Sequence, residues 1–337
     1  AGAGGSGSLS LYTWGEYDDP AVLKSFAKTD GGATVKLGSY DSNEELIAKL
    51  TAAKGTSGYD LVVPTISFIP QMIELKLLEK LDQSKLPNLK NVDPVYLDTD
   101  FDKGNRYSVP KAFGASGYVY DTTVITRDLT SWKDFFDAAQ NEAAGKTSFI
   151  ADPNEILWAY FFSIGEDINT NDSGTLDAAK DFLVKNIAPN VQAFESYVSN
   201  TIAQNGRVLA HAFNGDARQG ILGNDDRNRY KWVKPSEGAG QFVDNWTIPV
   251  GAKNIDAAHA FIDYVLDQDV SLKELLYIGY NTAVTGIVEK ATAAGVELPE
   301  LIFYSEEETK KLVFDIVPES QEQRVAIFND IQAAAGA

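Results

Sequence analysis

The segment LSLYTWGEYDDP at Leu9–Pro20 passes directly from a strand pattern to a helix start. Leu11 and Tyr12 lie in its short apolar, strand-like run. Asp19 is a suitable helix cap, and Pro20 suits the first helical position, where its missing N–H costs nothing. A strand that stops just before a helix is typical of a ligand-facing βα loop at the carboxyl edge of an α/β sheet.

The loop of this segment carries two aromatic residues and an acid, Trp14, Tyr17 and Glu16. Aromatic faces and a carboxylate attract the same partner, a cation, because the ring quadrupole and the negative charge act together. The alternative is an aromatic side chain half-buried at a domain surface beside a solvated acid. The segment alone leaves both interpretations open.

The composition indicates an ordinary globular chain with an acidic surface. Its 337 residues are enough for about two domains, each with its own core. A net charge of −19, from 48 acidic and 29 basic residues, argues against a general nucleic-acid binder and would draw cations toward any cleft. A solvated surface explains most of these charges equally well. No apolar run approaches the roughly 18 residues of a membrane span.

The chain has no cysteine, which excludes disulfides, zinc–thiolate sites and thiol catalysis. Residues 1–8, AGAGGSGS, are expected to form a flexible leader without core-forming side chains. This leader is either an expression scar or the spacer of a lipoprotein whose anchoring cysteine has been removed, and we favour the spacer.

Two more strand–loop–helix units follow the first. Residues 34–37 are expected to form a strand, and Ser42 with Glu45 gives the cap pattern of the next helix. The apolar run 59–64 is typical of a strand buried on both faces, and a helix is expected at 70–78. Three successive units of this kind predict a parallel sheet with right-handed crossovers.

The chain is expected to cross into a second domain at the turn-rich stretch Ala112–Ser116, between predicted strands at 106–110 and 117–120. The alternation of the remaining elements predicts an α/β fold. Strands are predicted at 147–151, 191–194, 205–213, 232–235 and 242–249, and helices at 156–164, 255–266, 272–276 and 321–335.

No catalytic motif stands out. Of the two histidines, His211 is expected in the core, and His259 is expected on a helix, at the surface or at the edge of the core. A G-x-S-x-G elbow, a G-x-x-x-x-G-K phosphate loop and a G-x-G-x-x-G motif after a strand are absent. A pair of carboxylates could hydrolyse glycosides, and tyrosines with acids could bind a hard metal ion, so these two classes remain as alternatives.

Aromatic, acidic and small hydroxyl residues recur in the loops that follow predicted strands, and they form the candidate ligand site. Carboxylates would pair with the N⁺–H donors of an organic ammonium, while rings would cover its methylenes. A buried amine without partners is costly, so the number and spacing of the acids should set the ligand length. The candidates are Trp14, Glu16, Tyr17, Tyr40, Asp41, Thr65, Ser67, Glu155, Phe213, Asp216, Phe242, Asp244 and Tyr280.

Several short stretches, taken in their order and spacing, match a known family. They are YTWGEY at 12–17, YDSNEEL at 40–46, YDLVVPTISF at 59–68, LDQSKLPNLKNVDP at 81–94, FNGD at 213–216, FVDNWTIPVGAKN at 242–254 and IGYNT at 278–282. With them the chain resembles the polyamine-binding receptors, of the spermidine/putrescine type, of bacterial ABC importers. The resemblance covers nearly the whole chain after the leader.

The resemblance implies a class II periplasmic-binding-protein-like fold, with two α/β lobes and a ligand cleft between them. Lobe 1 is expected at 9–114 plus 247–295, and lobe 2 at 115–246 plus 296–337. It implies a monomeric, non-enzymatic receptor without cofactor or metal, at the periplasmic or extracellular face of the cell membrane. The receptor would close around a polyamine and deliver it to ABC permease subunits, and a lipid anchor on a precursor would fit the leader.

The resemblance also assigns roles to the candidate residues. Trp14 and Tyr17 would pack on the ligand, with Glu16 and Asp41 near its amine end. Glu155 would be a carboxylate of the second lobe, and Asp216 and Asp244 would pair with ammonium groups. The aromatic walls would be Phe213, Phe242 and Tyr280.

Three positions depart from the family pattern. Phe213 stands where the family commonly has tryptophan, Gly15 replaces a hydroxyl residue, and Ser67 stands where some members have tyrosine. A phenyl ring attracts a cation less strongly than an indole. Putrescine, spermidine, another organic amine or an amino acid therefore remain open as ligands.

Overall fold

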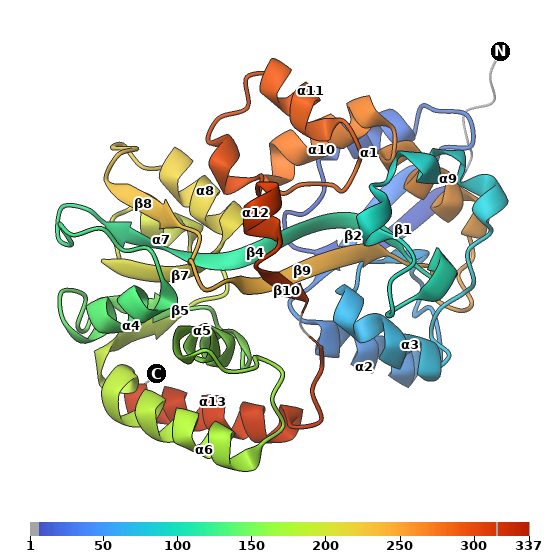
Figure 1. The fold of residues 1–337 in the computed structure, drawn as a ribbon. Helices are drawn as coiled ribbons and strands as arrows, with labels where there is room; N and C mark the ends of the chain where they lie inside the picture. The colour runs from blue at the N-terminus through green and yellow to red at the C-terminus, as the bar shows by residue number, and fades with distance from the viewer. Residues whose placement is uncertain (1–6, 315, 337) are drawn as a thin grey trace. The chain divides into compact units, whose positions relative to one another are not determined.

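The computed structural model describes residues 7–314 and 316–336, and the chain divides into two compact units (Figure 1). Unit 1 comprises Ala1–Phe113 and Phe242–Pro299, and unit 2 comprises Gly114–Gln241 and Glu300–Ala337. The expected leader at 1–8 lies outside the described residues up to residue 6, and Ser8 already belongs to a strand.

A three-stranded parallel sheet is the framework of unit 1, as the sequence predicts. The middle strand β1 (Ser8–Trp14) lies between β2 (Thr34–Tyr40) and β3 (Leu61–Val62). β1 pairs with both neighbours in parallel. Because parallel strands share their carboxyl edge, the loops after the three strands open on the same side of the sheet.

Side-chain caps fix where the first two helices begin. Asp19 accepts a hydrogen bond from a first-turn backbone N–H (2.9 Å) at the start of α1 (Pro20–Phe26). Ser42 does the same for the N–H of Glu45 (3.1 Å) at the start of α2 (Asn43–Ala53). Both starts lie where the sequence predicts them, and the loops before them therefore have defined ends.

The other helices of unit 1 pack on its sheet or belong to its second segment, Phe242–Pro299. Leu46 and Leu50 of α2 pack with Met72 and with Tyr12 of β1 in one apolar cluster. The bounds are α3 (Ile69–Glu74), α9 (Ile255–Val265), α10 (Gln268–Ile278) and α11 (Ile287–Ala293).

Residues 242–246 belong to unit 1, whereas the sequence analysis expects them in the second lobe. They form the end of β9 (Ala239–Trp246). Isolated antiparallel bridges join Thr65 to Asp244 and Val62 to Thr247, so this segment continues along the β3 side of the sheet of unit 1. The correction matters because it places Asp244 beside the loop that follows β3.

The strand β4 (Val109–Asp121) contradicts the turn predicted at Ala112–Ser116, because it runs through that stretch without a break and is buried along its whole length. Gly114 and Ser116 favour a turn locally. Antiparallel pairing of the following residues with β7 on one side and β8 on the other outweighs this preference. The predicted crossing between the two domains does lie in this strand, between Phe113 and Gly114.

In the described part of the chain, unit 2 is organised on a seven-stranded mixed sheet with the order β10-β9-β4-β7-β5-β6, with β8 also paired to β4. β5 is parallel to both β6 and β7, while β4 is antiparallel to β7. The bounds are β5 (Thr147–Phe149), β6 (Val191–Phe194), β7 (Leu209–Phe213), β8 (Tyr230–Val233) and β10 (Leu312–Phe314).

Helices complete the core of unit 2. Trp132, Phe135, Phe149 and Phe161 are fully buried in one aromatic-rich cluster. The C-terminal helix α13 packs along α6, as Figure 1 shows. The bounds are α4 (Trp132–Gln140), α5 (Glu155–Ile164), α6 (Ser173–Phe182), α7 (Ser199–Ala203), α8 (Asn214–Leu222), α12 (Glu306–Thr309) and α13 (Gln321–Ala335).

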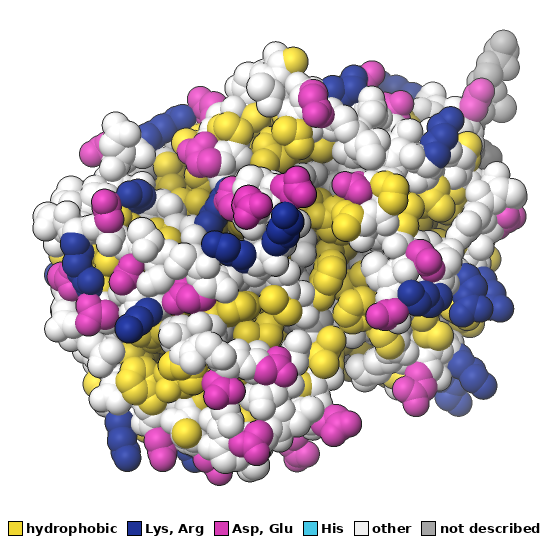
Figure 2. Space-filling model, viewed as in Figure 1, with side chains coloured by type: hydrophobic (Ala, Val, Ile, Leu, Met, Phe, Trp, Pro, Cys, Tyr) yellow, Lys and Arg dark blue, Asp and Glu magenta, His cyan; other side chains and the backbone are white. Residues whose placement is uncertain are grey.

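The surface mixes both signs of charge. Figure 2 shows acidic and basic side chains interspersed on one face, with both kinds gathered over α12. There Lys310 pairs with Glu307 (3.4 Å) and Lys234 pairs with Glu308 (2.7 Å). No helix among the described residues combines the length and the apolar character that crossing a membrane requires.

Candidate functional site

Asp244 of β9 is the centre of a buried hydrogen-bonded group in unit 1. Its Oδ2 accepts a hydrogen bond from Tyr17 Oη (2.8 Å), and its Oδ1 accepts one from Thr65 Oγ1 (2.8 Å). Burial raises the pKa of Asp244 to about 6, while the two hydroxyl donors and the charge of Lys111 act in the opposite direction. The carboxylate is therefore oriented and sensitive to any further positive charge.

The ends of three strand-to-helix connections build this group. Tyr17 lies between β1 and α1, and Thr65 follows β3. Asn43, the first residue of α2, holds Thr65 from both sides, because its Oδ1 accepts the Thr65 N–H (2.8 Å) and its Nδ2 donates to Thr65 Oγ1 (3.0 Å). The predicted parallel sheet therefore brings Tyr17 and Thr65 to one edge, and β9 adds the acid.

Aromatic rings surround this acid. The Tyr17 and Tyr280 ring centroids are 6.3 Å apart, and those of Phe242 and Tyr280 are 5.5 Å apart, both pairs edge to face. Tyr280 follows Gly279, which ends α10 in the left-handed conformation at φ 73°. Of the predicted site, the structure brings together Tyr17, Thr65, Phe242, Asp244 and Tyr280.

Trp14 and Tyr40 form a neighbouring aromatic pair with a structural hydrogen-bond partner. Their centroids are 4.8 Å apart. Trp14 Nε1 donates to the backbone oxygen of Val63 (2.8 Å), and the hydroxyl of Tyr40 donates to the same oxygen. Tyr40 is buried in the core of unit 1, whereas Trp14 is only half-buried. The indole of Trp14 therefore keeps an exposed part, while Tyr40 supports it.

The remaining predicted residues of unit 1 differ in exposure. Glu16 and Asp41 are exposed, and Glu16 has a φ of 52°, a conformation uncommon for a side chain other than glycine. Ser67 is buried, and its hydroxyl has no hydrogen-bond partner among the described residues. Exposed loop acids can reach a ligand, but the structure does not fix them as it fixes Asp244.

Lys111 of β4 is a charged residue that the sequence analysis missed. Its buried ammonium donates to the backbone oxygen of Tyr17 (2.8 Å) and lies 3.3 Å from Asp18 Oδ1 and 3.5 Å from Glu274 Oε2. Burial raises the pKa of Asp18 and raises that of Glu274 to about 7, against the charge of Lys111. The three side chains are far apart in sequence, so no local pattern could have indicated their contact.

Glu155 is a buried acid of unit 2, at the first position of α5. Burial raises its pKa to about 8, and a hydrogen bond with Ser116 acts against this shift. His211 Nε2 lies 3.3 Å from Glu155 Oε2, and His211 Nδ1 accepts a hydrogen bond from the backbone N–H of Ile150 (3.4 Å). Burial lowers the pKa of His211 to about 3, so the imidazole is neutral near pH 7.

Both histidines have structural partners, the role that the sequence predicts for His211, whereas His259, expected at the surface or the edge of the core, is buried. His211 is buried beside the rings of Trp132 and Phe149. His259 of α9 is also buried, contacts the carbonyl of Ile255 through Nδ1 (2.9 Å) and accepts the N–H of Asp82 (2.9 Å). The contact between His211 and the predicted site residue Glu155 was not foreseen.

Phe213 and Asp216 lie where β7 turns into α8. Phe213 is half-buried at the end of β7, and Asp216 lies in the first turn of α8. Burial raises the pKa of Asp216 to about 7. Asn214 fixes this junction, because it accepts the N–H of Ala115 (3.1 Å) and donates to the carbonyl of Leu301 (2.8 Å).

These groups suit the binding of a cation more than bond-making chemistry. Glu155, Asp216 and Asp244 are each protonated more readily than ordinary acids, because burial disfavours their charge. An ammonium ion would supply the missing positive charge and hydrogen-bond donors. Among the described residues, no three histidine, cysteine or acidic side chains are grouped so as to hold a metal ion.

The chain is similar to curated proteins over most of its length. It is 35% identical over 285 residues to spermidine/putrescine-binding periplasmic protein 1 of Haemophilus influenzae, covering 84% of this chain and 77% of the relative. It is 33% identical over 322 residues to the putrescine-binding periplasmic protein SpuD of Pseudomonas aeruginosa, covering 90% of this chain and 85% of that protein.

Solved structures of other proteins also match this chain over nearly its whole length. The Tp0655 (TpPotD) lipoprotein of Treponema pallidum matches with a TM-score of 0.84 and 28% identity, covering 96% of this chain and 99% of that one. The spermidine/putrescine ABC transporter substrate-binding protein PotD of Streptococcus pneumoniae matches with a TM-score of 0.82 and 28% identity, covering 98% of this chain and 100% of that one. The predicted class II α/β fold with two lobes is confirmed.

The family model for bacterial extracellular solute-binding proteins matches residues 21–300. That span includes most of unit 1 and the candidate acids Glu155, Asp216 and Asp244. The resemblance stated from the sequence is therefore confirmed at the level of the family. This chain belongs to the family of bacterial extracellular solute-binding proteins.

Proposed function

We propose that this protein binds a polyamine of the putrescine or spermidine type outside the cytoplasm and delivers it to the permease of an ABC importer. The observation that carries the proposal is the buried carboxylate of Asp244, whose two oxygens accept hydrogen bonds from Tyr17 and Thr65. Rings of Phe242 and Tyr280 lie beside that group. A primary ammonium on an alkyl chain fits a carboxylate next to aromatic faces.

The relatives support the ligand class and the transport role. Proteins named as spermidine/putrescine-binding and putrescine-binding match more than three-quarters of this chain. None of these relatives is named as an enzyme, so capture without turnover is the activity proposed here. The periplasm or the outer face of the membrane is the proposed location.

In this proposal, Asp244 of unit 1 pairs with an ammonium group of the ligand, and Glu155 and Asp216 of unit 2 are the further acids proposed to pair with ammonium groups. Two or more acids separated along a binding site select for a chain with a charge at each end. A ligand that binds one conformation best shifts the population toward that conformation. Trp14, Tyr17 and Phe213 are the aromatic side chains proposed to cover the methylenes, and exposed Glu16 and Asp41 are proposed to assist at one amine end.

A thermal-shift screen of the whole chain tests the proposal. Putrescine, spermidine, spermine, choline, amino acids and divalent metal ions are compared at the same concentration. A ligand at about 100 times its Kd stabilises the folded state by about 2.7 kcal/mol, which raises the Tm of a domain of this size by about 5 °C or more. A rise with a polyamine is the expected result. A rise with a metal ion or an amino acid alone, and none with any polyamine, would overturn it.

A further inference from the structure

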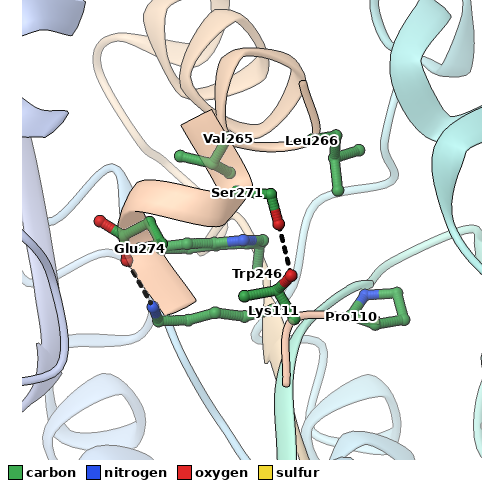
Figure 3. Close-up of a pocket in the computed structure, with 8 residues that line it drawn as sticks. Pro110, Lys111, Trp246, Val265, Leu266, Ser271 and Glu274 are labelled. Atoms are coloured by element: carbon green, nitrogen blue, oxygen red, sulfur yellow. Dashed lines mark hydrogen bonds and ion pairs between the residues drawn. The ribbon is translucent and has the colours of Figure 1, made fainter. Parts of the chain in front are cut away.

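Lys111 is one of the most completely buried charged side chains of unit 1. Its side chain is 3% exposed, and its ammonium lies 4.3 Å from the centroid of the Tyr17 ring and 4.7 Å from that of the Trp246 ring. Figure 3 shows it directed toward Glu274, with the indole of Trp246 alongside it. Burial of an ammonium at this depth is costly unless acids and oxygens surround it, as they do here.

Lys111 contacts Tyr17 at two separate points. The ammonium donates to the backbone oxygen of Tyr17 (2.8 Å) and also lies over its ring. The hydroxyl at the far end of the same ring donates to Asp244 Oδ2 (2.8 Å). A side chain whose backbone and ring face are both held has little freedom to withdraw its hydroxyl.

The acids around Lys111 are already engaged. Asp18 and Glu274 both lie within ion-pair distance of the ammonium, and Glu274 Oε1 also accepts the N–H of Asp19 (2.9 Å) at the cap of α1. Asp244 is the nearby acid that Lys111 does not contact directly. The ion cluster therefore leaves Asp244, and not Asp18 or Glu274, to take an external ammonium.

We propose that Lys111 is a positioning residue for ligand binding: it holds Tyr17 so that the tyrosine hydroxyl orients Asp244, and it occupies Asp18 and Glu274 so that Asp244, and neither of these two acids, accepts the ligand. This inference rests on the proposed function for the ligand, but the contacts on which it depends lie entirely within unit 1.

The charge of Lys111 and the hydrogen bonds to Asp244 both favour the ionised form of this acid. The positive charge of Lys111 lowers the pKa of Asp244 against the effect of burial, as do the hydrogen bonds from Tyr17 and Thr65. Tyr40 also faces this acid, and the nearby negative charge contributes to the raised pKa of the phenol. Beside the ion cluster, a cavity of about 10 Å³ between Lys111 and Thr282 has room for at most about one water molecule.

The test compares the wild type with K111M/E274Q. Methionine keeps the length of the lysine stem, and glutamine keeps an acceptor for the Asp19 N–H, so one charge of each sign is removed together. We expect about tenfold weaker polyamine binding by calorimetry. In a Y17F background, which lacks the hydroxyl through which Lys111 acts, the same pair of changes should cost less than threefold. Equal losses in both backgrounds would overturn the proposal.

A control separates this effect from the loss of an ion pair elsewhere in the chain. Lys234 and Glu308 form a partly exposed pair in unit 2, with Nζ and Oε2 2.7 Å apart. K234M/E308Q should leave the affinity within twofold of wild type. A tenfold loss in this control would show that affinity follows general stability, and would contradict a specific role for Lys111.

A second readout does not need a ligand. The ¹³C carboxyl resonance of Asp244, assigned from its absence in D244N, should titrate at higher pH in K111M/E274Q than in the wild type. An unchanged titration overturns the inference even if polyamines bind, and a shifted one supports it even if the screen for polyamines fails.

If K111M/E274Q does not fold, the ¹⁵Nζ resonance of Lys111 is followed instead, in the folded wild type and in D244N. A titration step near the pKa of Asp244 should be present in the wild type and missing from D244N. Identical curves for the two proteins contradict the proposal.

Discussion

Asp244 is buried, yet each of its oxygens accepts a hydroxyl hydrogen bond, from Tyr17 and from Thr65. Burial raises the pKa of this acid, so its charge is only partly compensated inside the protein. Such a group gains more from an incoming ammonium than a solvated acid does, because the ion pair forms away from water.

The substitution Asp244→Asn should weaken polyamine binding by more than tenfold without unfolding the protein. An amide keeps the size of the side chain and an acceptor oxygen but removes the charge that pairs with the ammonium. Isothermal titration calorimetry measures the affinity. Asp30→Asn is the matched control, because Asp30 is exposed and its substitution by asparagine removes the same charge. A Kd unchanged in D244N, or changed equally in D30N, would count against the assignment.

The substitution Phe213→Trp should tighten binding about two- to fivefold. An indole face attracts a cation more strongly than a phenyl face. Phe213 is half-buried at the junction of β7 and α8. The Kd for putrescine is the measurement, and Phe213→Leu, which keeps an apolar side chain but removes the ring, should weaken binding. No gain with tryptophan would mean that the ring does not face an ammonium.

At the scale of elements, β4 packs closely against β8. A Cβ added to Gly117 would lie 2.5 Å from the backbone oxygen of Val233 and 2.6 Å from the Trp232 ring. Gly15, in the loop after β1, has nothing within 4 Å of such a Cβ. The two glycines therefore form a matched pair.

Gly117→Ala should lower the Tm by several degrees, since overpacking typically costs about 1–3 kcal/mol, while Gly15→Ala should leave it within about 1 °C. Differential scanning calorimetry on both variants decides this. Equal melting temperatures in the two variants would show that β4 and β8 can separate without cost.

Much of the element-scale fold could be predicted from the sequence, and the reasons are local. Asp19 before Pro20 and Ser42 before Glu45 are local signals of a helix start, because each can cap the helix with its own side chain. The structure has both caps. The turn predicted at Ala112–Ser116 was wrong, because strand partners that are distant in sequence determine whether glycine and serine are extended or form a turn.

Part of the candidate site could also be predicted, because it follows from the order of strands and helices along the chain. Tyr17 and Thr65 follow parallel strands, and that topology alone places them at one edge of a sheet. The ion cluster of Asp18, Lys111 and Glu274 has no local signal, since a lysine that is to be buried has the same sequence appearance as an exposed one. Only the folded chain shows that its acids are engaged.

At the scale of the whole molecule, acids in both units share raised pKa values, about 8 for Glu155, about 7 for Asp216 and about 6 for Asp244. From pH 6.5 to 8, Glu155 and Asp216 hold protons in the folded state that the unfolded chain has released. The folded state binds more protons in this window, so stability falls as the pH rises. His211, with a pKa lowered to about 3, acts in the opposite direction, mainly below its unfolded-state pKa of 6.5.

The ligand-free protein should therefore melt at a lower temperature at pH 8 than at pH 6.5. E155Q should reduce this difference, because it removes the acid with the largest shift. Bound polyamine should reduce it too, since an ammonium favours the ionised acids. Melting curves at both pH values, with and without spermidine, provide the measurement. A ligand-free Tm that rises with pH over this window would contradict the assigned protonation states.

The central claim is that buried, partly protonated acids become carboxylates when they receive an alkylammonium. Calorimetric titration of the wild type with putrescine and spermidine at pH 7, in two buffers with different ionisation enthalpies, measures the protons exchanged on binding. Saturable binding with a net release of protons to the buffer is the expected result. Absence of binding by either amine, or binding with no proton released, would contradict it.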